Sequence, residues 1–365
     1  MKVFRCPACN QQVYFNNLRC LSCGSVLAFD PESRTMLAFA APWGECYDAS
    51  STSAGASHVP CVHRQGARAC NWAVRSQAGA SNECASCRLT DAGASTGEMG
   101  HEARWLSAET AKRRLLRTLF ELGVFVNAEN PNDGSLRLRF VWQVPSANAP
   151  VLTGHDSGTV TLNLLEADDD HRESARVAFG EPLRTVLGHL RHEVAHYLDA
   201  RWVDTNAALS AEFSKLMGDK SLDYAQALAH HYAHGAPADW QQRHISAYAS
   251  AHPWEDWAET CAHYLLMVDA VETAADWGLS LDKVPDVQLR ESTHVFDLPA
   301  DDLVWQQWLP VSRFLNSMAR SIGVRDSYPF VVAPVVVQKI AFVRKVLLHA
   351  RGASGSTLST HAQSH

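Results

Sequence analysis

The chain has little of what marks membrane proteins, secreted proteins or proteins that coat nucleic acids. None of its apolar runs reaches the roughly 18 residues needed to cross a bilayer, and the most apolar stretch, residues 328–337, contains Pro329 and Pro334. The first residues, MKVFRC, lack the basic segment and apolar run of a signal peptide. A formal net charge of −7 argues against nucleic acid as a partner. We therefore expect a cytoplasmic protein without membrane association.

Cysteine is scarce in most of the chain and concentrated near its start. Nine of the ten cysteines lie between Cys6 and Cys87, and only Cys261 follows them in the 365 residues. In a reducing compartment such a cluster binds metal more often than it forms disulfides. A hydrophobic content of 46% excludes wholesale disorder, and the length allows two or three domains. The cysteine distribution predicts a metal-rich N-terminal quarter followed by a cysteine-poor folded region.

Two CxxC motifs separated by ten residues give the strongest metal signal. They are Cys6-Pro-Ala-Cys9 and Cys20-Leu-Ser-Cys23, and Gly24 can take the positive φ that often follows such a turn. Four thiolates at this spacing close a tetrahedron around Zn²⁺ and leave no open position. We predict a structural zinc ribbon over residues 1–35, with a redox dithiol or chance cysteine pairs as the alternative.

A second group of four cysteines is spaced less regularly. The surrounding segment is rich in Ser, Ala and Gly, so a bound metal would supply stability that a small core cannot. The predicted ligands of this second zinc-binding segment, residues 36–104, are Cys61, Cys70, Cys84 and Cys87. Cys46, His58 and His63 are nearby substitutes, and a set of free cysteines is the alternative. Free buried cysteine is common enough to explain Cys46 and Cys261 without a ligand role.

The remainder of the chain has the periodicity of helices with a small sheet. Alternation predicts strands over 136–144 and 158–165, and low complexity predicts a disordered tail over 351–365. Helical spacing predicts helices over 108–122, 182–199, 222–234, 254–276, 303–322 and 335–349. The predicted fold class is therefore α+β, with an N-terminal zinc-ribbon region followed by a mainly α-helical domain over 105–350.

The segment His192-Glu-Val-Ala-His196 is an HExxH motif. Because residues i and i+4 share one face of a helix, both imidazoles can bind a single zinc ion. Glu193 lies about 100° further round the helix and can face a water molecule on the metal. A helix with two surface histidines is the alternative interpretation.

A catalytic zinc needs a third protein ligand and an open position. Glu255 and Glu259 stand at i and i+4, so both can face the HExxH helix from one side of a second helix. Pro253 and Trp254 place Glu255 in the first turn of that helix. Asp256 points elsewhere, where it would favour the helix N-terminus.

This layout resembles that of gluzincin metallopeptidases, and a Tyr seven residues before the first Glu resembles the lethal-factor-type peptidases. The resemblance implies that Glu255 is the third ligand, that Glu259 supports the site and that Tyr248 stabilises the oxyanion. Asp256 and Trp257 stand where that group has two aromatic residues. Glu259 therefore stays an alternative ligand.

Nearly the whole chain also resembles a family of bacterial zinc-binding metallopeptidases that carry an N-terminal zinc ribbon. The matching stretches are residues 6–23, 69–72, 84–90, 111–115, 152–155, 184–197, 246–264 and 328–330. The resemblance implies a zincin-like metallopeptidase domain over 105–350 and favours the second group of cysteine ligands. It implies no particular substrate.

The expected function is zinc-dependent hydrolysis of a peptide or protein, with one catalytic zinc and one or two structural zincs. Glu193 would take the proton of a zinc-bound water, while zinc and Tyr248 stabilise the oxyanion. The strand over 158–165 is expected to pair with an extended substrate. The alternative is a zinc-ribbon adaptor or peptide-binding regulator on a non-cleaving zincin scaffold, and the ribbons could bind a protein partner. Glu193 argues against that alternative, because a scaffold needs the histidines but not the base.

Other polar clusters are interpreted as structural. The acidic run over 166–170 is expected to form a solvated turn. His189 and His263 lie near the proposed ligands, yet single histidines in such places are more often surface or core residues. The three histidines within residues 230–234 lack an acidic neighbour at the right spacing for a metal site.

Overall fold

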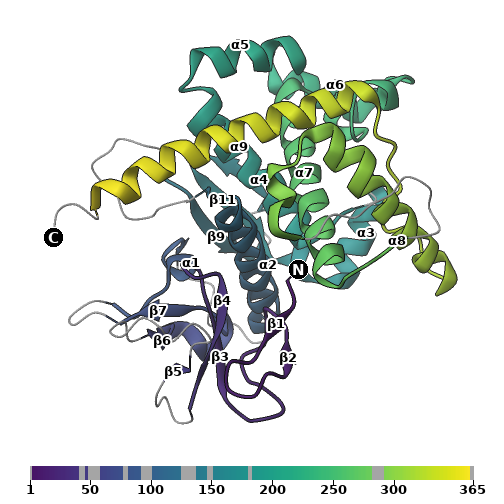
Figure 1. Cartoon of the computed structure of the whole chain (residues 1–365). Coiled ribbons are helices and arrows are strands. Elements are labelled where there is room, and N and C mark those ends of the chain that lie inside the picture. The colour runs from purple at the N-terminus through teal and green to yellow at the C-terminus, as the bar shows by residue number, and fades with distance from the viewer. Residues whose placement is uncertain are drawn as a thin grey trace.

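The computed structural model describes residues 2–40, 46–47, 58–76, 81–91, 101–124, 137–145, 151–179, 183–281 and 292–361. Short strands occupy the N-terminal part and helices most of the rest, which confirms the predicted α+β class. The helices are α1 (Ala85–Arg88), α2 (His101–Glu121), α3 (Asp169–Phe179), α4 (Val186–Leu198), α5 (Ala207–Leu216), α6 (Tyr224–His234), α7 (Pro253–Asp276), α8 (Leu309–Ser321) and α9 (Pro334–His361). Figure 1 shows α2 between the N-terminal strands and the helices that follow it in the chain.

The N-terminal strands form three small antiparallel sheets. Their pairs are β1 (Phe4–Arg5) with β2 (Gln12–Val13), β3 (Val26–Asp30) with β4 (Thr35–Phe39), β4 with β5 (Cys46–Tyr47), and β6 (His58–Pro60) with β7 (Ala73–Arg75). The expected segment boundary at residue 35 therefore falls inside the β3–β4 hairpin. Across this boundary, the backbone N–H of Phe29 in the first segment donates to the carbonyl of Asn71 in the second at 2.6 Å. The two cysteine-rich segments thus fold together.

A chain of aromatic rings joins this unit to α2. Phe29 packs edge-on against Phe15 and Trp72, with ring centroids 5.1 and 5.8 Å apart. Trp72 in turn lies 5.5 Å from Phe120 of α2. Because these rings are buried, one hydrophobic core continues from the strands into the helical part.

All six predicted helices are present with shifted ends, and three further helices, the single-turn α1 and the longer α3 and α5, were not predicted. The acidic run predicted as a solvated turn leads into α3, with Asp169 and Asp170 in its first turn, where carboxylates favour a helix N-terminus. Helix α5 begins after Asn206, whose side chain accepts hydrogen bonds from two backbone N–H groups.

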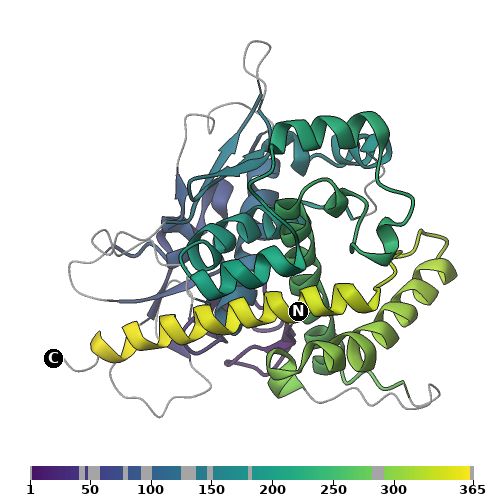
Figure 2. The same ribbon diagram turned by 90° about the horizontal axis from the view of Figure 1, so that it is seen from above.

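Helix α9 continues as a helix to His361, whereas the sequence predicts a disordered tail from residue 351. Adding residues to an existing helix costs little compared with nucleating one, and the preceding turns of α9 are packed in the core. Residues 362–365 lie outside the described residues. In Figure 2, α9 crosses the helical half of the molecule from end to end. No helix of the described residues combines the length and apolarity that crossing a membrane requires.

A four-stranded sheet has the order β10 (Gly154–Asp156), β11 (Thr159–Asn163), β9 (Arg139–Gln143) and β8 (Thr90–Asp91). Strand β11 pairs antiparallel with β10 and parallel with β9. The expectation that strand 158–165 pairs with an extended substrate is therefore wrong, because β10 already occupies its outer side at residues 159–161. A tight turn at Ser157 and Gly158, both with positive φ, folds β10 against it and gives β10 the outer position.

Helix α2 connects the zinc-ribbon region and the later helices through buried ion pairs. Lys112 and Glu109 are fully buried, with Nζ 3.0 Å from Oε2, and Trp142 of β9 donates to Glu109 at 2.8 Å. The same ammonium group donates to the carbonyl of Ser86 at 2.9 Å. Further along α2, Arg117 pairs with Glu272 of α7 at 2.6 Å. Buried charges held in this way fix the position of α2 against both neighbours.

Replacing Lys112 with alanine tests this connection. The Glu109 carboxylate would lose its nearest cation inside the core, so we expect the free energy of unfolding in urea to fall by about 3–5 kcal/mol. The control is Arg139→Ala, which removes an exposed ion pair with Asp91 (58% and 53% exposed) and should cost less than about 1 kcal/mol. Equal losses in the two variants would contradict a core role for Lys112.

Candidate metal centres

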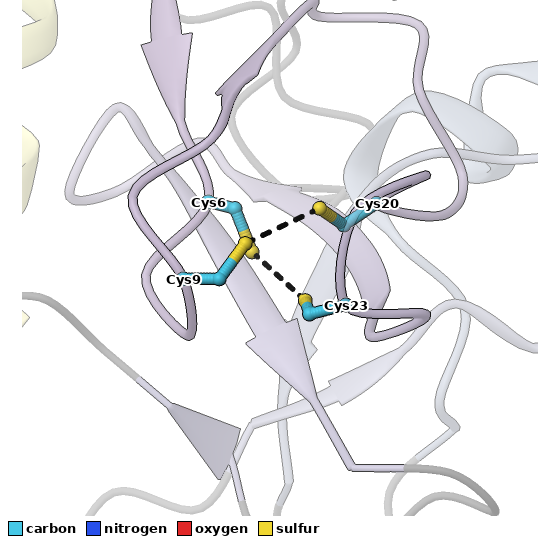
Figure 3. A group of neighbouring side chains, drawn as sticks. All are labelled: Cys6, Cys9, Cys20 and Cys23. Carbon is cyan, nitrogen blue, oxygen red and sulfur yellow. Dashed lines mark hydrogen bonds between the residues drawn. The ribbon is translucent and has the colours of Figure 1, made fainter.

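The first four cysteines converge from two turns of similar construction (Figure 3). Asn10 and Gly24 follow the second cysteine of each CxxC motif, take a positive φ, and donate backbone hydrogen bonds to Cys6 and Cys20. Sulfur–sulfur distances are 3.7 Å for Cys6–Cys23 and 3.6 Å for Cys9–Cys20. A zinc–thiolate tetrahedron with bonds of about 2.3 Å has edges of about 3.8 Å. The four thiols fit zinc and are too far apart for disulfides.

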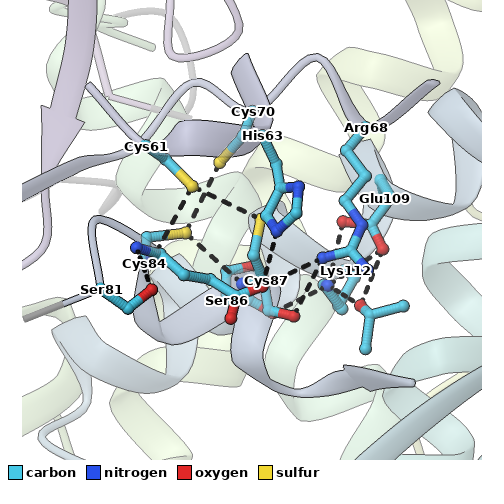
Figure 4. A network of polar contacts seen from close by, with 12 residues as sticks. Cys61, His63, Arg68, Cys70, Ser81, Cys84, Ser86, Cys87, Glu109 and Lys112 are labelled. Carbon is cyan, nitrogen blue, oxygen red and sulfur yellow. Dashed lines mark hydrogen bonds and ion pairs between the residues drawn. The ribbon is translucent and has the colours of Figure 1, made fainter. Parts of the chain in front are cut away.

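The second four cysteines form a group of the same kind, with all four buried, and Glu109 and Lys112 of α2 lie beside it (Figure 4). The sulfur–sulfur distances are 3.8 Å for Cys61–Cys87 and 3.5 Å for Cys70–Cys84. Backbone N–H groups of Cys84 and Cys87 donate to Cys61 and Cys84 sulfurs at 3.4 Å, and hydrogen bonds from the other thiols lower the pKa of Cys61. These contacts favour a thiolate at Cys61, whereas burial raises the pKa of Cys84, so the positive charge of a bound metal would be needed to hold all four as thiolates.

Three nearby residues were considered as alternative ligands for this group. Two of them, His63 and His58, contact carboxylates instead. His63 Nε2 contacts Glu83 at 2.7 Å, and His58 lies 3.9 Å from Asp30. Cys46 belongs to β5, but its side chain is not among those described. Cys261 is buried in the core, away from the three groups of potential ligands.

The third group of potential ligands brings together His192, His196 and Glu255. Helix α4 begins after Thr185, whose side chain caps the Gly188 N–H at 2.9 Å, and it presents both imidazoles on one face. The two Nε2 atoms are 3.2 Å apart. Glu255 Oε2 lies 3.0 Å from His192 Nε2, and Oε1 lies 3.7 Å from His196 Nε2. Zinc with ligand bonds of about 2.0–2.1 Å has edges of about 3.3 Å, so these atoms fit it.

Helix α7 carries the carboxylates to this point. His252 caps its first turn by accepting the Trp254 N–H at 3.1 Å, and Pro253 follows as the first helical residue. Glu255 is almost fully buried, and its Oε2 accepts no hydrogen bond of good geometry. A buried carboxylate oxygen without a donor is costly unless a cation satisfies it. This oxygen is therefore a candidate metal ligand.

Glu259 stands on the opposite side of the His192 ring. Its Oε1 lies 2.8 Å from His192 Nδ1, and its Oε2 accepts from the Ser246 hydroxyl at 2.6 Å. Burial opposes charge on His192, but the Glu255 and Glu259 carboxylates raise its pKa well above the usual range. The two carboxylates thus contact different nitrogens of one imidazole.

Helices α4 and α7 are held together beside the ligands. The Trp257 indole Nε1 donates to the Ala195 carbonyl at 2.7 Å. One turn before Ala195 on α4 and about three turns after Trp257 on α7, Arg191 and Asp269 form an ion pair, and Asp269 also accepts from Thr118 of α2 at 2.6 Å. Asp256, predicted to favour the helix N-terminus, is buried and pairs with Lys339 of α9 and His244.

Glu193 of α4 is next to His192 in the sequence and is buried, with 9% exposure. Burial raises its pKa to about 7, with a further contribution from Glu255 and Glu259 that His192 opposes. A carboxylate with a pKa near neutrality can exchange a proton with water at physiological pH.

Three aromatic side chains lie against the ligands. The Tyr248 ring centroid is 6.1 Å from that of His192, and burial together with nearby Glu255 raises the pKa of this phenol. Trp254 packs on His196 with centroids 3.9 Å apart. The Tyr224 hydroxyl donates to Glu255 Oε1 at 2.7 Å. Tyr224 was not singled out from the sequence, because no spacing rule links it to a ligand 31 residues away.

The other histidines considered from the sequence do not join the ligand group found among the described residues. Burial lowers the pKa values of His189 and His263 to about 4. His189 lies 3.6 Å from Glu166, and His263 hydrogen bonds with the Tyr328 hydroxyl at 2.8 Å. His230 and His234 stack on the exposed face of α6, apart from the three ligand groups of the described residues.

Comparisons with known proteins agree with this arrangement. The profile of a family described as "Putative zinc-binding metallo-peptidase" matches residues 101–346, and that of a zinc-ribbon domain matches residues 3–94. The chain belongs to this zinc-binding metallopeptidase family. The chain also resembles uncharacterized proteins of Mycobacterium bovis and of two strains of Mycobacterium tuberculosis. Each is 39% identical over 354 residues, which cover 95% of this chain and 95% of the relative. No solved structure matches the chain.

Zinc analysis of the purified protein tests the three ligand groups. We expect about three zinc ions per chain, one for each group, and about two in the His192→Ala/His196→Ala variant. The control is His230→Ala/His234→Ala, which removes two exposed histidines of the same spacing and should keep about three. An unchanged zinc content after loss of His192 and His196 would contradict a metal site between α4 and α7.

Proposed function

We propose that the protein is a zinc-dependent metallopeptidase of the HExxH gluzincin type, which hydrolyses peptide bonds in a peptide or protein substrate. The observation that carries this proposal is the convergence of His192, His196 and Glu255 on one point, with Glu193 beside them. Two neutral imidazoles and one carboxylate leave a bound Zn²⁺ with net positive charge. Family membership supports zinc and a metallopeptidase role.

The positions of the two carboxylates favour Glu255 over Glu259 as the third ligand. Glu255 lies on the Nε2 side of His192, where His196 Nε2 also lies. Glu259 instead faces Nδ1, which is the position of a carboxylate that orients a metal-binding imidazole. In this proposal Ser246 holds the second oxygen of Glu259 and thereby fixes the His192 ring.

Zinc bound at this point would act as a Lewis acid toward water and the peptide carbonyl. Glu193 accepts the proton of the attacking water and later donates it to the leaving amine, a role that its raised pKa suits. Tyr248 stays protonated at neutral pH, because burial raises its pKa. Its hydroxyl can then donate to the carbonyl oxygen as negative charge develops there.

We assign the two four-cysteine groups a structural role, because four thiolates leave zinc no open position. Their thiols also require a reducing environment, which favours the cytoplasm. Leu21, on the second turn of the first group, is 95% exposed. An exposed apolar side chain beside a zinc site could serve a protein partner, so partner binding by the ribbon is part of the proposal.

Glu193→Gln tests hydrolysis. The amide cannot accept the proton of water, so we expect cleavage of a fluorogenic peptide library to fall by about 10²–10⁴-fold. Zinc content should stay at the wild-type value, because Glu193 is outside the ligand group. If wild type and variant both bind library peptides and neither cleaves them, the protein is a non-cleaving peptide-binding regulator instead.

Tyr248→Phe tests the assignment of the oxyanion donor. Removing one such donor lowers kcat by about 10²–10³-fold in comparable sites. We expect the loss in kcat, with little change in KM and in zinc content, because the ring and its packing remain. A variant with a raised KM and unchanged kcat would show that Tyr248 binds the substrate rather than the oxyanion.

A further inference from the structure

We call the proposed ligands His192, His196 and Glu255 the metal group. Helix α6 lies against this group although none of its own residues is buried. Its first residue, Tyr224, reaches Glu255, and its His231 ring lies edge-on to Tyr248 with centroids 5.9 Å apart. Both contacts end on residues assigned above to the metal group or its reaction. A helix without a buried face derives little stability from packing, so such contacts weigh more in holding it.

The Tyr224 side chain is set into the start of α7. Its ring lies edge-on to His252 and Trp254, with centroids 5.3 and 5.6 Å away. His252 caps α7, and its Nε2 lies 3.2 Å from the Leu222 carbonyl just before α6. The phenol is therefore directed at the first turn of α7, which contains Glu255.

The hydrogen bond from Tyr224 distinguishes the two oxygens of Glu255. Oε1 accepts from the Tyr224 hydroxyl at 2.7 Å, whereas Oε2 lies nearest to His192 Nε2 at 3.0 Å and accepts no hydrogen bond of good geometry. With Oε1 engaged, the carboxylate offers Oε2 to a metal. Partners of this kind orient a ligand and strengthen metal binding.

The metal group is largely covered in this arrangement. Glu255 is 1% exposed, His196 3% and Glu193 9%, and the His192 side chain keeps 13%, so little of the group is open to an extended peptide. An element over the group must move to admit a peptide, as lids do in many enzymes. Helix α6 is suited to such movement, because it touches the group and has no buried residue of its own.

We propose that Tyr224 is a positioning residue for the Glu255 carboxylate, and that its hydrogen bond latches α6 as a lid over the metal group. The proposal rests on the proposed function, since it takes Glu255 to be a metal ligand. Loss of the hydroxyl would free the carboxylate to rotate and release the lid. The ring of Tyr224 would keep its contacts with His252 and Trp254.

Metal affinity tests the positioning role without any substrate. The protein is first treated with a chelator that removes the zinc of the His–Glu group and leaves two ions in the cysteine groups, and it is then titrated with Co²⁺. We expect Tyr224→Phe to bind the third ion about 10–100-fold more weakly and to change its visible spectrum. The control is Tyr232→Phe, a 64% exposed phenol on the same helix, which should match wild type.

Amide hydrogen exchange tests the latch. In Tyr224→Phe, the amides of α6 should exchange faster than in Tyr232→Phe, because the released helix opens more often. Wild-type Co²⁺ affinity and spectrum in Tyr224→Phe would overturn the positioning role, and unchanged exchange in α6 would overturn the lid. If wild type itself takes up no third ion, the proposed function fails before this test begins.

Discussion

The Asp269 carboxylate joins the three helices on which the rest of the molecule depends. It pairs with Arg191 of α4 and accepts from Thr118 of α2, while lying on α7 itself. Arg191 is the residue before His192, and α7 carries Glu255 and Glu259. Burial opposes charge on Asp269, but Arg191 and Arg117 lower its pKa. One buried anion therefore sets the register of the two ligand-bearing helices, and any axial slip between them would separate these charges.

The positions of most of the proposed metal ligands were predictable because short-range geometry determines them. A CxxC turn places its two thiols together in any context, and an i, i+4 pair shares a helix face once the helix forms. The cysteine groups and the His192–His196 pair are of this kind. The choice between Glu255 and Glu259 could not be made from spacing, since both face α4. It depends on which side of the His192 ring each carboxylate reaches, and that is a matter of how α4 and α7 pack.

Other features depend on contacts between distant segments and left no signal in the sequence. Tyr224 looks like any helical tyrosine until α6 lies beside the start of α7. Strand 158–165 has the alternation expected of a half-buried strand, which does not reveal whether another strand covers its outer side. Lys112 and Glu109 look like an exposed i, i+3 pair, yet they are fully buried because β9 and α1 pack over them.

Strand β8 gives the fold a consequence for how the protein matures. Thr90 and Asp91 follow the second cysteine group closely and pair with β9 of the sheet beside α4. With the thiolates holding zinc as proposed, the segment that supplies β8 gains its order from the metal. The sheet would then lack its outer strand, and α2 its buried partner at Ser86, until zinc arrives. Zinc binding at the cysteines would consequently come before completion of the sheet, so the metal would set the order in which the two halves of the molecule assemble.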